Sequence, residues 1–209
     1  HLLENTFFTV DQIGRSYGFP FPYFHGSLSI SRASRTFPQY LIFKPSMVLT
    51  AALLIYYWKK NNLLINKLNN TEKLNYKFFT FGVLSAIFLI IHSLLLGIET
   101  DIKIFKLLRR LVLLGFIIFE IIAQGILVYN LYKLKDEIQD LSNRFILKIK
   151  IFLVTILSTV AILSLPILTT SGNVHFKHGL EWNYFIGVIL FYLLTRLFWK
   201  NLKPLTSNS

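Results

Sequence analysis

The sequence predicts an all-α integral membrane protein, a polytopic bundle of transmembrane helices. Of its 209 residues, 54% are hydrophobic and only 15% are charged, with a mean hydropathy of +0.54, whereas about a quarter of a soluble domain is charged. The apolar residues also gather in long runs that carry almost no charge in their middles. A hydrocarbon core about 30 Å thick needs roughly 20 such residues at 1.5 Å each.

Five runs are long enough to cross a membrane. Several of them end in Trp or Tyr, which are enriched where a membrane meets water. The connections are of roughly 10 to 20 residues, too short for a second folded domain, so we expect one helical bundle over residues 41–200. The predicted spans cover residues 41–58, 78–98, 111–132, 151–170 and 182–199.

Basic residues in the connections predict the orientation of the spans. Segments 59–77 and 133–150 each hold five Lys or Arg, whereas 171–181 holds only Lys177. Because basic residues gather on the cytoplasmic side, the first two segments are predicted to be cytosolic. The 99–110 connection is basic for the opposite side, since it has four Lys or Arg against Glu99 and Asp101.

This orientation gives the two ends of the chain different environments. Residues 201–209 are predicted to be a cytosolic tail, and residues 1–40 a non-cytoplasmic loop segment. The chain starts with His1 and not with Met. We therefore expect the loop segment to follow a first helix that is missing here, which would make six spans in the full-length protein.

Composition also excludes several classes of function. The net charge of +12 is divided among short clusters between spans and forms no basic face with aromatic platforms, so nucleic acid is not an expected partner. There is no Cys, which removes thiolate chemistry and Cys-based metal sites. The chain also lacks a Gly-rich phosphate loop, a nucleophile elbow and an H-E-x-x-H motif. We predict no cofactor and favour a protein that is not an enzyme.

The third span carries the first candidate site. Glu120 lies near its middle, with Gln124 one turn later on the same face. An ionisable group there costs roughly 2.5 to 3.5 kcal/mol and therefore needs a partner, a proton or the bundle interior. His92 is predicted at a similar depth in the second span. Glu120, Gln124 and His92 are thus expected to form an intramembrane polar cluster, which is either a structural hydrogen bond, a proton relay or a binding point for a lipid hydroxyl or headgroup.

The predicted lumenal loops supply a second set of candidate residues. His175, His178 and Glu181 recur every three residues in HFKHGLE, a workable zinc set if helical. Gly179 argues against a regular helix, so we predict a solvated loop or headgroup contact and no metal site. Arg32 and Arg35 lie among serines in the first loop and could hold a phosphate through bidentate contacts, or the loop could simply be solvated.

The lysines of segment 59–77 are expected to set the topology first. A second use is attraction to anionic lipid, worth about 1 kcal/mol for each residue. They are Lys59, Lys60, Lys67, Lys73 and Lys77.

Three strings in this order resemble the DRAM-like membrane family. They are SLSISRASRTFPQYLIFK at 27–44, AALLIYYW at 51–58 and LEWNYFIGVILFYLLTRLFW at 180–199. The family includes the damage-regulated autophagy modulators, Golgi proteins that remodel the lipid of GPI anchors, and yeast regulators of plasma-membrane lipid organisation. The third span is preceded by IKIFKLLRR, not by the His-rich entry of the GPI-remodelling branch, so the subfamily stays open.

The resemblance implies a six-helix fold with both ends in the cytosol and a role in lipid handling, either GPI-anchor lipid remodelling or lipid-dependent trafficking and autophagy regulation. It implies a Golgi, ER, endolysosomal or plasma-membrane location, with membrane lipids and lipid-anchored protein clients as partners. It supplies no catalytic residue. Two alternatives are a small proton-coupled transporter that uses Glu120 and His92, and a non-catalytic subunit with a membrane-protein partner.

Overall fold

The computed structural model describes residues 39–68, 74–96, 103–169 and 172–200, together with Phe24, Gly26, Ser29 and Ile30. Arg32 and Arg35 lie outside the described residues. Five helices are long and apolar enough to cross a membrane, which confirms the predicted fold class. They are α4 (Gln39–Leu68), α5 (Lys77–Leu95), α6 (Lys103–Lys133), α7 (Arg144–Thr169) and α8 (Val174–Phe198).

Most of the helices extend beyond the spans that hydropathy predicts. Helix α4 continues ten residues past Trp58, through a Lys- and Asn-containing stretch, and α7 begins at Arg144, seven residues before the predicted span. The physical reason is that a helix satisfies its own backbone hydrogen bonds in lipid and in water alike. Hydropathy therefore predicts the apolar part of a helix, whereas the ends of the helix are set by its capping residues.

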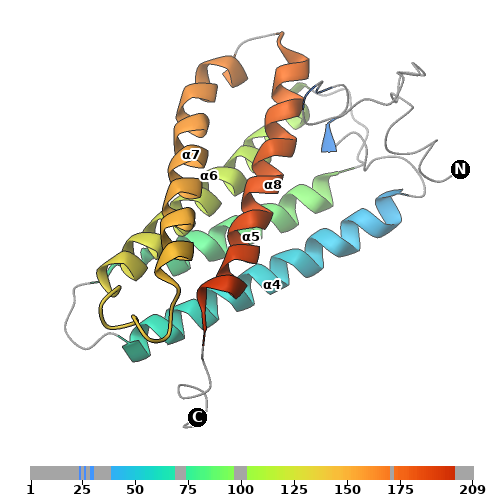
Figure 1. Ribbon diagram of the computed structural model, residues 1–209. Helices are drawn as coiled ribbons and strands as arrows, with labels where there is room; N and C mark the ends of the chain where they lie inside the picture. The colour runs from blue at the N-terminus through green and yellow to red at the C-terminus, as the bar shows by residue number, and fades with distance from the viewer. Residues whose placement is uncertain are drawn as a thin grey trace, which may run out of the picture.

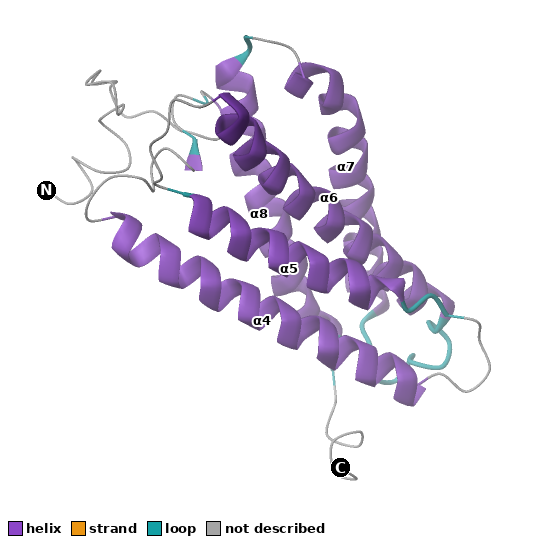
Figure 2. Cartoon of the chain, turned by 180° about the vertical axis from the view of Figure 1, so that it is seen from behind, coloured by secondary structure: helices purple, strands orange, loops and turns teal. Residues whose placement is uncertain are grey.

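Neighbouring helices pack in chain order, and consecutive helices run in opposite directions (Figures 1 and 2). Helix α5 lies between α4 and α6, and α7 packs against both α6 and α8. Helices α4, α6 and α8 end where α5 and α7 begin. We call this the basic end of the bundle, because the described Lys and Arg residues of segments 59–77 and 133–150 lie here.

A clasp between two segments far apart in the sequence fixes the last helix at the basic end. The backbone N–H of Asn143 donates to Phe198 O over 2.8 Å, and the N–H of Lys200 donates to Leu141 O over 2.9 Å. Ser142 and Trp199 thereby form an antiparallel bridge. The end of α8 is thus tied to the connection between α6 and α7.

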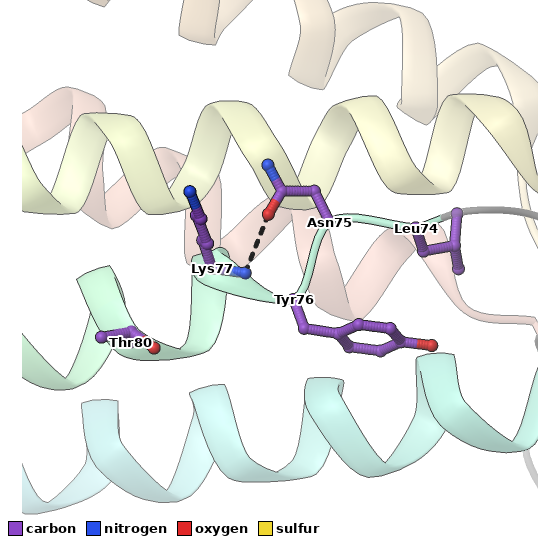
Figure 3. Close-up of a pocket in the computed structure, with 5 residues that line it drawn as sticks. All are labelled: Leu74, Asn75, Tyr76, Lys77 and Thr80. Carbon is purple, nitrogen blue, oxygen red and sulfur yellow. Dashed lines mark hydrogen bonds between the residues drawn. The ribbon is translucent and has the colours of Figure 1, made fainter.

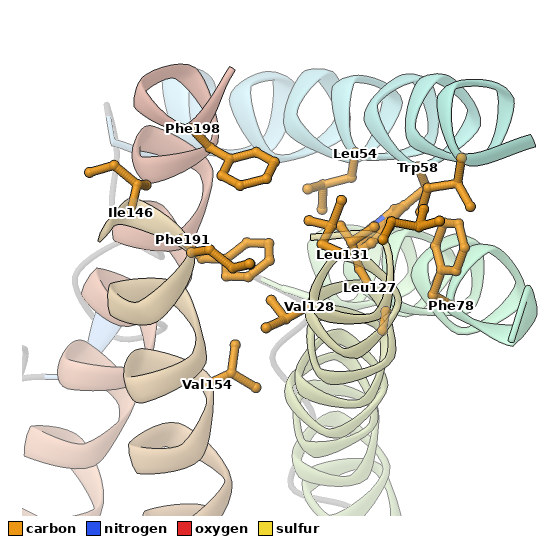
Figure 4. Close-up of a cluster of buried hydrophobic side chains, with 14 of the residues drawn as sticks. Leu54, Trp58, Phe78, Leu127, Val128, Leu131, Ile146, Val154, Phe191 and Phe198 are labelled. Atoms are coloured by element: carbon orange, nitrogen blue, oxygen red, sulfur yellow. The ribbon is translucent and has the colours of Figure 1, made fainter. Parts of the chain in front are cut away.

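The apolar core lies toward the basic end, and α6 is at its centre. In Figure 4, Leu127, Val128 and Leu131 of α6 stand between two groups of side chains. One group comes from α4 and α5, and the other from α7 and α8. The first group includes Leu54, Trp58 and Phe78, and the second includes Ile146, Val154, Phe191 and Phe198.

A glycine lets α4 and α5 approach closely. Trp58 is fully buried, and its ring lies over Gly82 so closely that an added Cβ would stand 2.4 Å from the indole. Small residues at such contacts are the usual means by which membrane helices pack, because lipid supplies no hydrophobic force between them. Gly125 of α6 differs, since a Cβ there would lie 3.7 Å from Val154 in ordinary contact.

Gly82→Ala is expected to destabilise the protein, and Gly125→Ala is its matched control. Forcing a methyl into a packed core costs about 1–3 kcal/mol, while both substitutions gain similar helix propensity. Thermal unfolding of the purified protein in detergent should give a lower midpoint for Gly82→Ala alone. Equal midpoints for the two variants would contradict the close Trp58–Gly82 packing.

Candidate functional site: a buried polar network

Glu120 is fully buried in the middle of the bundle and is hydrogen-bonded to side chains of three helices. Gln124 Nε2, one turn later on α6, donates to Oε1 over 2.9 Å, and the Tyr192 hydroxyl of α8 donates to the same oxygen. Ser85 Oγ of α5 lies 2.6 Å from Oε2. Ser85 is eight residues after the start of the 19-residue α5 and ten before its end, so this carboxyl lies near the middle of the span.

The position of Ser85 explains how a carboxyl is tolerated here. Ser85 Oγ lies within hydrogen-bond distance of two acceptors, Glu120 Oε2 and, at 2.8 Å, Gly82 O. A hydroxyl has only one proton to donate. With a proton on Oε2, the carboxyl donates to Ser85, Ser85 donates to Gly82, and no charge is buried. The geometry therefore accommodates Glu120 as a neutral acid.

Two tyrosines and a threonine extend the polar contacts toward the basic end. The rings of Tyr57 (α4) and Tyr192 (α8) meet edge to face with centroids 4.7 Å apart. The Tyr57 hydroxyl lies 3.1 Å from Thr195 Oγ1, and Thr195 donates to Phe191 O over 3.1 Å. Thr195 is one turn after Tyr192, so the same face of α8 contacts both Glu120 and Tyr57.

Lys150 completes the network from α7. Its side chain is fully buried, and Nζ donates to Thr195 Oγ1 over 2.6 Å. Nζ also lies 4.0 Å from the centroid of the Phe191 ring and 5.8 Å from that of Phe198. Such rings attract a cation through their electron-rich faces. Within the described part of the chain, no carboxylate forms an ion pair with Lys150.

These contacts form one buried polar network that involves all five helices. Because an exposed backbone or side-chain polar group is costly in lipid, a network of this kind holds the helices in one register. Two further polar atoms at its Glu120 end, Gln124 Oε1 and Trp58 Nε1, are buried without a hydrogen bond among the described residues. The network residues are Tyr57, Ser85, Glu120, Gln124, Lys150, Tyr192 and Thr195.

The predicted cluster is brought together only in part. Glu120 and Gln124 are hydrogen-bonded as expected, but the partner from α5 is Ser85 and not His92. His92 is buried seven residues further along α5, about 10 Å along the helix axis. A similar depth in the two spans predicts this pairing, but the packing of α5 against α6 aligns Ser85 with Glu120 instead.

The residues of the predicted lumenal loop lie in the first turns of α8, so the expectation of an irregular segment around Gly179 is wrong. Gly179 is buried, and its backbone lies close to Gly26 from the segment before α4. His178 Nδ1 lies 2.9 Å from Gly26 O, whereas His175 is exposed. Over the described ranges, no three His, Asp or Glu side chains, Glu181 included, gather closely enough to hold a metal ion.

Sequence reasoning missed five members of the network: Tyr57, Ser85, Lys150, Tyr192 and Thr195. The sequence places Lys150 among the basic residues of the 133–150 connection, which predict the orientation of the spans. Its neighbour Lys148 is exposed, as that prediction requires. A signal was present in KIKIF, because two lysines two residues apart on a helix point in different directions, so they cannot share one exposed face. The hydroxyl-bearing residues gave no such signal, since they are common in spans.

The described pockets lie away from this network. One is lined by Leu74, Asn75, Tyr76, Lys77 and Thr80 (Figure 3), and the other by residues from Gln139 to Phe145 with Lys200. Both lie at the basic end. The carrier alternative needs a water-filled path to Glu120, and neither of these pockets reaches it.

No family model, no curated protein and no solved structure matches the chain. The resemblance to the DRAM-like family therefore stays a prediction. What the structure establishes is an integral membrane protein with five candidate spans.

Glu120→Gln is expected to keep the fold, while Glu120→Ala is not. The Gln amide can donate to Ser85 and accept from Tyr192 and Gln124, as a neutral acid does, so its unfolding free energy should fall by less than about 1 kcal/mol. Glu120→Ala leaves those partners unpaired and should cost about 1–3 kcal/mol. Denaturation in detergent measures both values. Equal losses would mean that the network requires an ionised carboxylate.

Lys150→Met is expected to leave the free energy of unfolding unchanged or to raise it by about 1 kcal/mol or more. The reason is that replacing a buried charged group by an apolar side chain of similar volume is often stabilising. Thr195 still has Tyr57 as a partner in this variant. Lys148→Met is the exposed control, and its unfolding midpoint should not change. A large loss for Lys150→Met would show that the amine supports the fold.

Proposed function

We propose that this integral membrane protein acts in lipid handling. We consider two roles, GPI-anchor lipid remodelling and lipid-dependent trafficking or autophagy regulation. Either would take place in Golgi, ER, endolysosomal or plasma membranes. Membrane lipids are the partners in both, with lipid-anchored proteins as clients in the first. The proposal begins from the resemblance to the DRAM-like family.

One observation supports the proposal most. Two of the strings that carry the resemblance, residues 51–58 and 180–199, belong to different helices and meet inside the bundle. Tyr57 of the first lies against Tyr192 and Thr195 of the second. The same two residues of α8 hold Glu120 and Lys150. The resembling strings thus contribute three of the seven residues of the polar network, where a shared function would reside.

The alternatives receive less support. A proton-coupled carrier was predicted to use Glu120 with His92, and the two lie about two helical turns apart along the bundle. A non-catalytic subunit would present an apolar outer face to its partner. The exposed faces of all five helices are apolar, but lipid alone accounts for such faces.

Rescue of GPI-anchor remodelling tests the leading branch. The full-length reading frame is expressed in cells that lack the GPI-remodelling member of this family, and surface retention of GPI-anchored proteins is measured. Restored retention is the expected result, with Glu120→Ala inactive if the network is required. Glu120→Gln, which keeps the hydrogen bonds, separates a structural role from a role of the acidic proton, because only the second would abolish rescue. No restoration by a correctly located protein would exclude this branch.

A further inference from the structure

The basic end carries a ring of cations at one depth. Three contacts fix this level: Trp58 of α4 with Phe78 of α5, Asn75 just before α5 with Asn130 of α6, and Lys150 of α7 with Thr195 of α8. A cation lies within three residues of each contact on each helix. We call these five cations the basic ring: Lys60, Lys77, Lys133, Lys148 and Arg196. Lys133 is half-buried and the other four are exposed.

The ring lies where lipid headgroups would be. Helix α5 has 19 residues, so it spans about 28 Å at 1.5 Å per residue, close to the thickness of a hydrocarbon core. Lys77, its first residue, therefore lies at the boundary of that core. Exposed tyrosines, which favour this boundary, accompany the ring, with Lys60 Nζ 5.5 Å from the ring centroid of Tyr56 and Lys133 Nζ 5.4 Å from that of Tyr129.

A pocket of about 550 Å³ opens at this boundary, at the start of α5 (Figure 3). Hydrogen bonds fix the backbone that lines this pocket. The N–H of Lys77 donates to Asn75 Oδ1 over 3.0 Å, and the Asn130 side chain of α6 bonds to both the N–H and the C=O of Asn75. The Lys77 side chain forms no ion pair in the described part of the chain. Thr80 adds a hydroxyl on the next turn, and no Asp or Glu lines this pocket.

The second pocket of the basic end is a poorer place for an anion. It contains Asp140, and its Arg144 is already bound, to Asp136 over 3.2 Å and to Gln139 over 2.6 Å. A phosphate would have to compete with these oxygens. Charge therefore favours the pocket at Lys77.

We infer that the pocket lined by Asn75, Tyr76, Lys77 and Thr80 binds the phosphate-bearing headgroup of an anionic phospholipid. Lys77 supplies the charge, Thr80 and the Asn75 amide supply hydrogen bonds, and the apolar side of α5 accommodates the acyl chains. The inference rests on the proposed function in one respect, since the headgroup held here would belong to the class of lipid that the protein handles.

Native mass spectrometry of the detergent-purified full chain tests the inference. Phosphatidylserine is titrated, with phosphatidylcholine as the neutral lipid and glycerophosphoserine as the soluble headgroup. Phosphatidylserine should bind most tightly. Lys77→Gln should raise its apparent Kd about five-fold, the change that ~1 kcal/mol per basic residue corresponds to. Lys148→Gln is the matched control, because Lys148 belongs to the ring but not to the pocket.

Several outcomes would overturn the inference. If Lys77→Gln and Lys148→Gln raised the apparent Kd equally, the basic ring as a whole would attract the anionic lipid, and there would be no specific site at Lys77. Equal binding of phosphatidylserine and phosphatidylcholine would show that charge is not recognised, and equally tight binding of glycerophosphoserine would assign the pocket to a soluble phosphate. Lys77-dependent binding without GPI rescue would reject that branch of the proposed function alone, and rescue without Lys77-dependent binding would reject this inference alone.

Discussion

The hydrogen bonding of the Glu120 carboxyl is the interaction on which the rest of the bundle depends. A carboxyl in the middle of an apolar span is costly unless its oxygens are paired, and here the partners come from α5, α6 and α8. A shift of either neighbouring helix by one residue would separate Ser85 or Tyr192 from the carboxyl. The cost of burying Glu120 therefore fixes how α5 and α8 are aligned with α6.

The bundle contains polar contacts beside its apolar core, because in lipid burial of apolar side chains does not by itself draw helices together. Close packing at Gly82 and hydrogen bonds through Tyr57, Tyr192 and Thr195 replace that force. Lys148 and Lys150 illustrate the same division, since the first is exposed in the basic ring and the second is enclosed by Thr195 and two Phe rings.

The proposed lipid role places two different polar sites at two depths. The network lies inside the bundle and can hold a proton, whereas the inferred headgroup pocket at Lys77 lies at the boundary of the hydrocarbon core. Helix α5 connects them, because Ser85 and Lys77 lie eight residues apart on it, about 12 Å. A lipid bound at Lys77 would thus contact the same helix that positions Glu120.

The sequence by itself determined the all-α membrane fold, its five spans and the pairing of Glu120 with Gln124. These follow from hydropathy and from one helical turn, which are local properties. Only the tertiary structure decided that Ser85 and not His92 faces Glu120, that HFKHGLE is helical, and that Lys150 points inward. The first and the last of these depend on the rotation and axial alignment of one helix against another. Spans of nearly uniform apolar composition leave that alignment undetermined until the few polar groups find their partners.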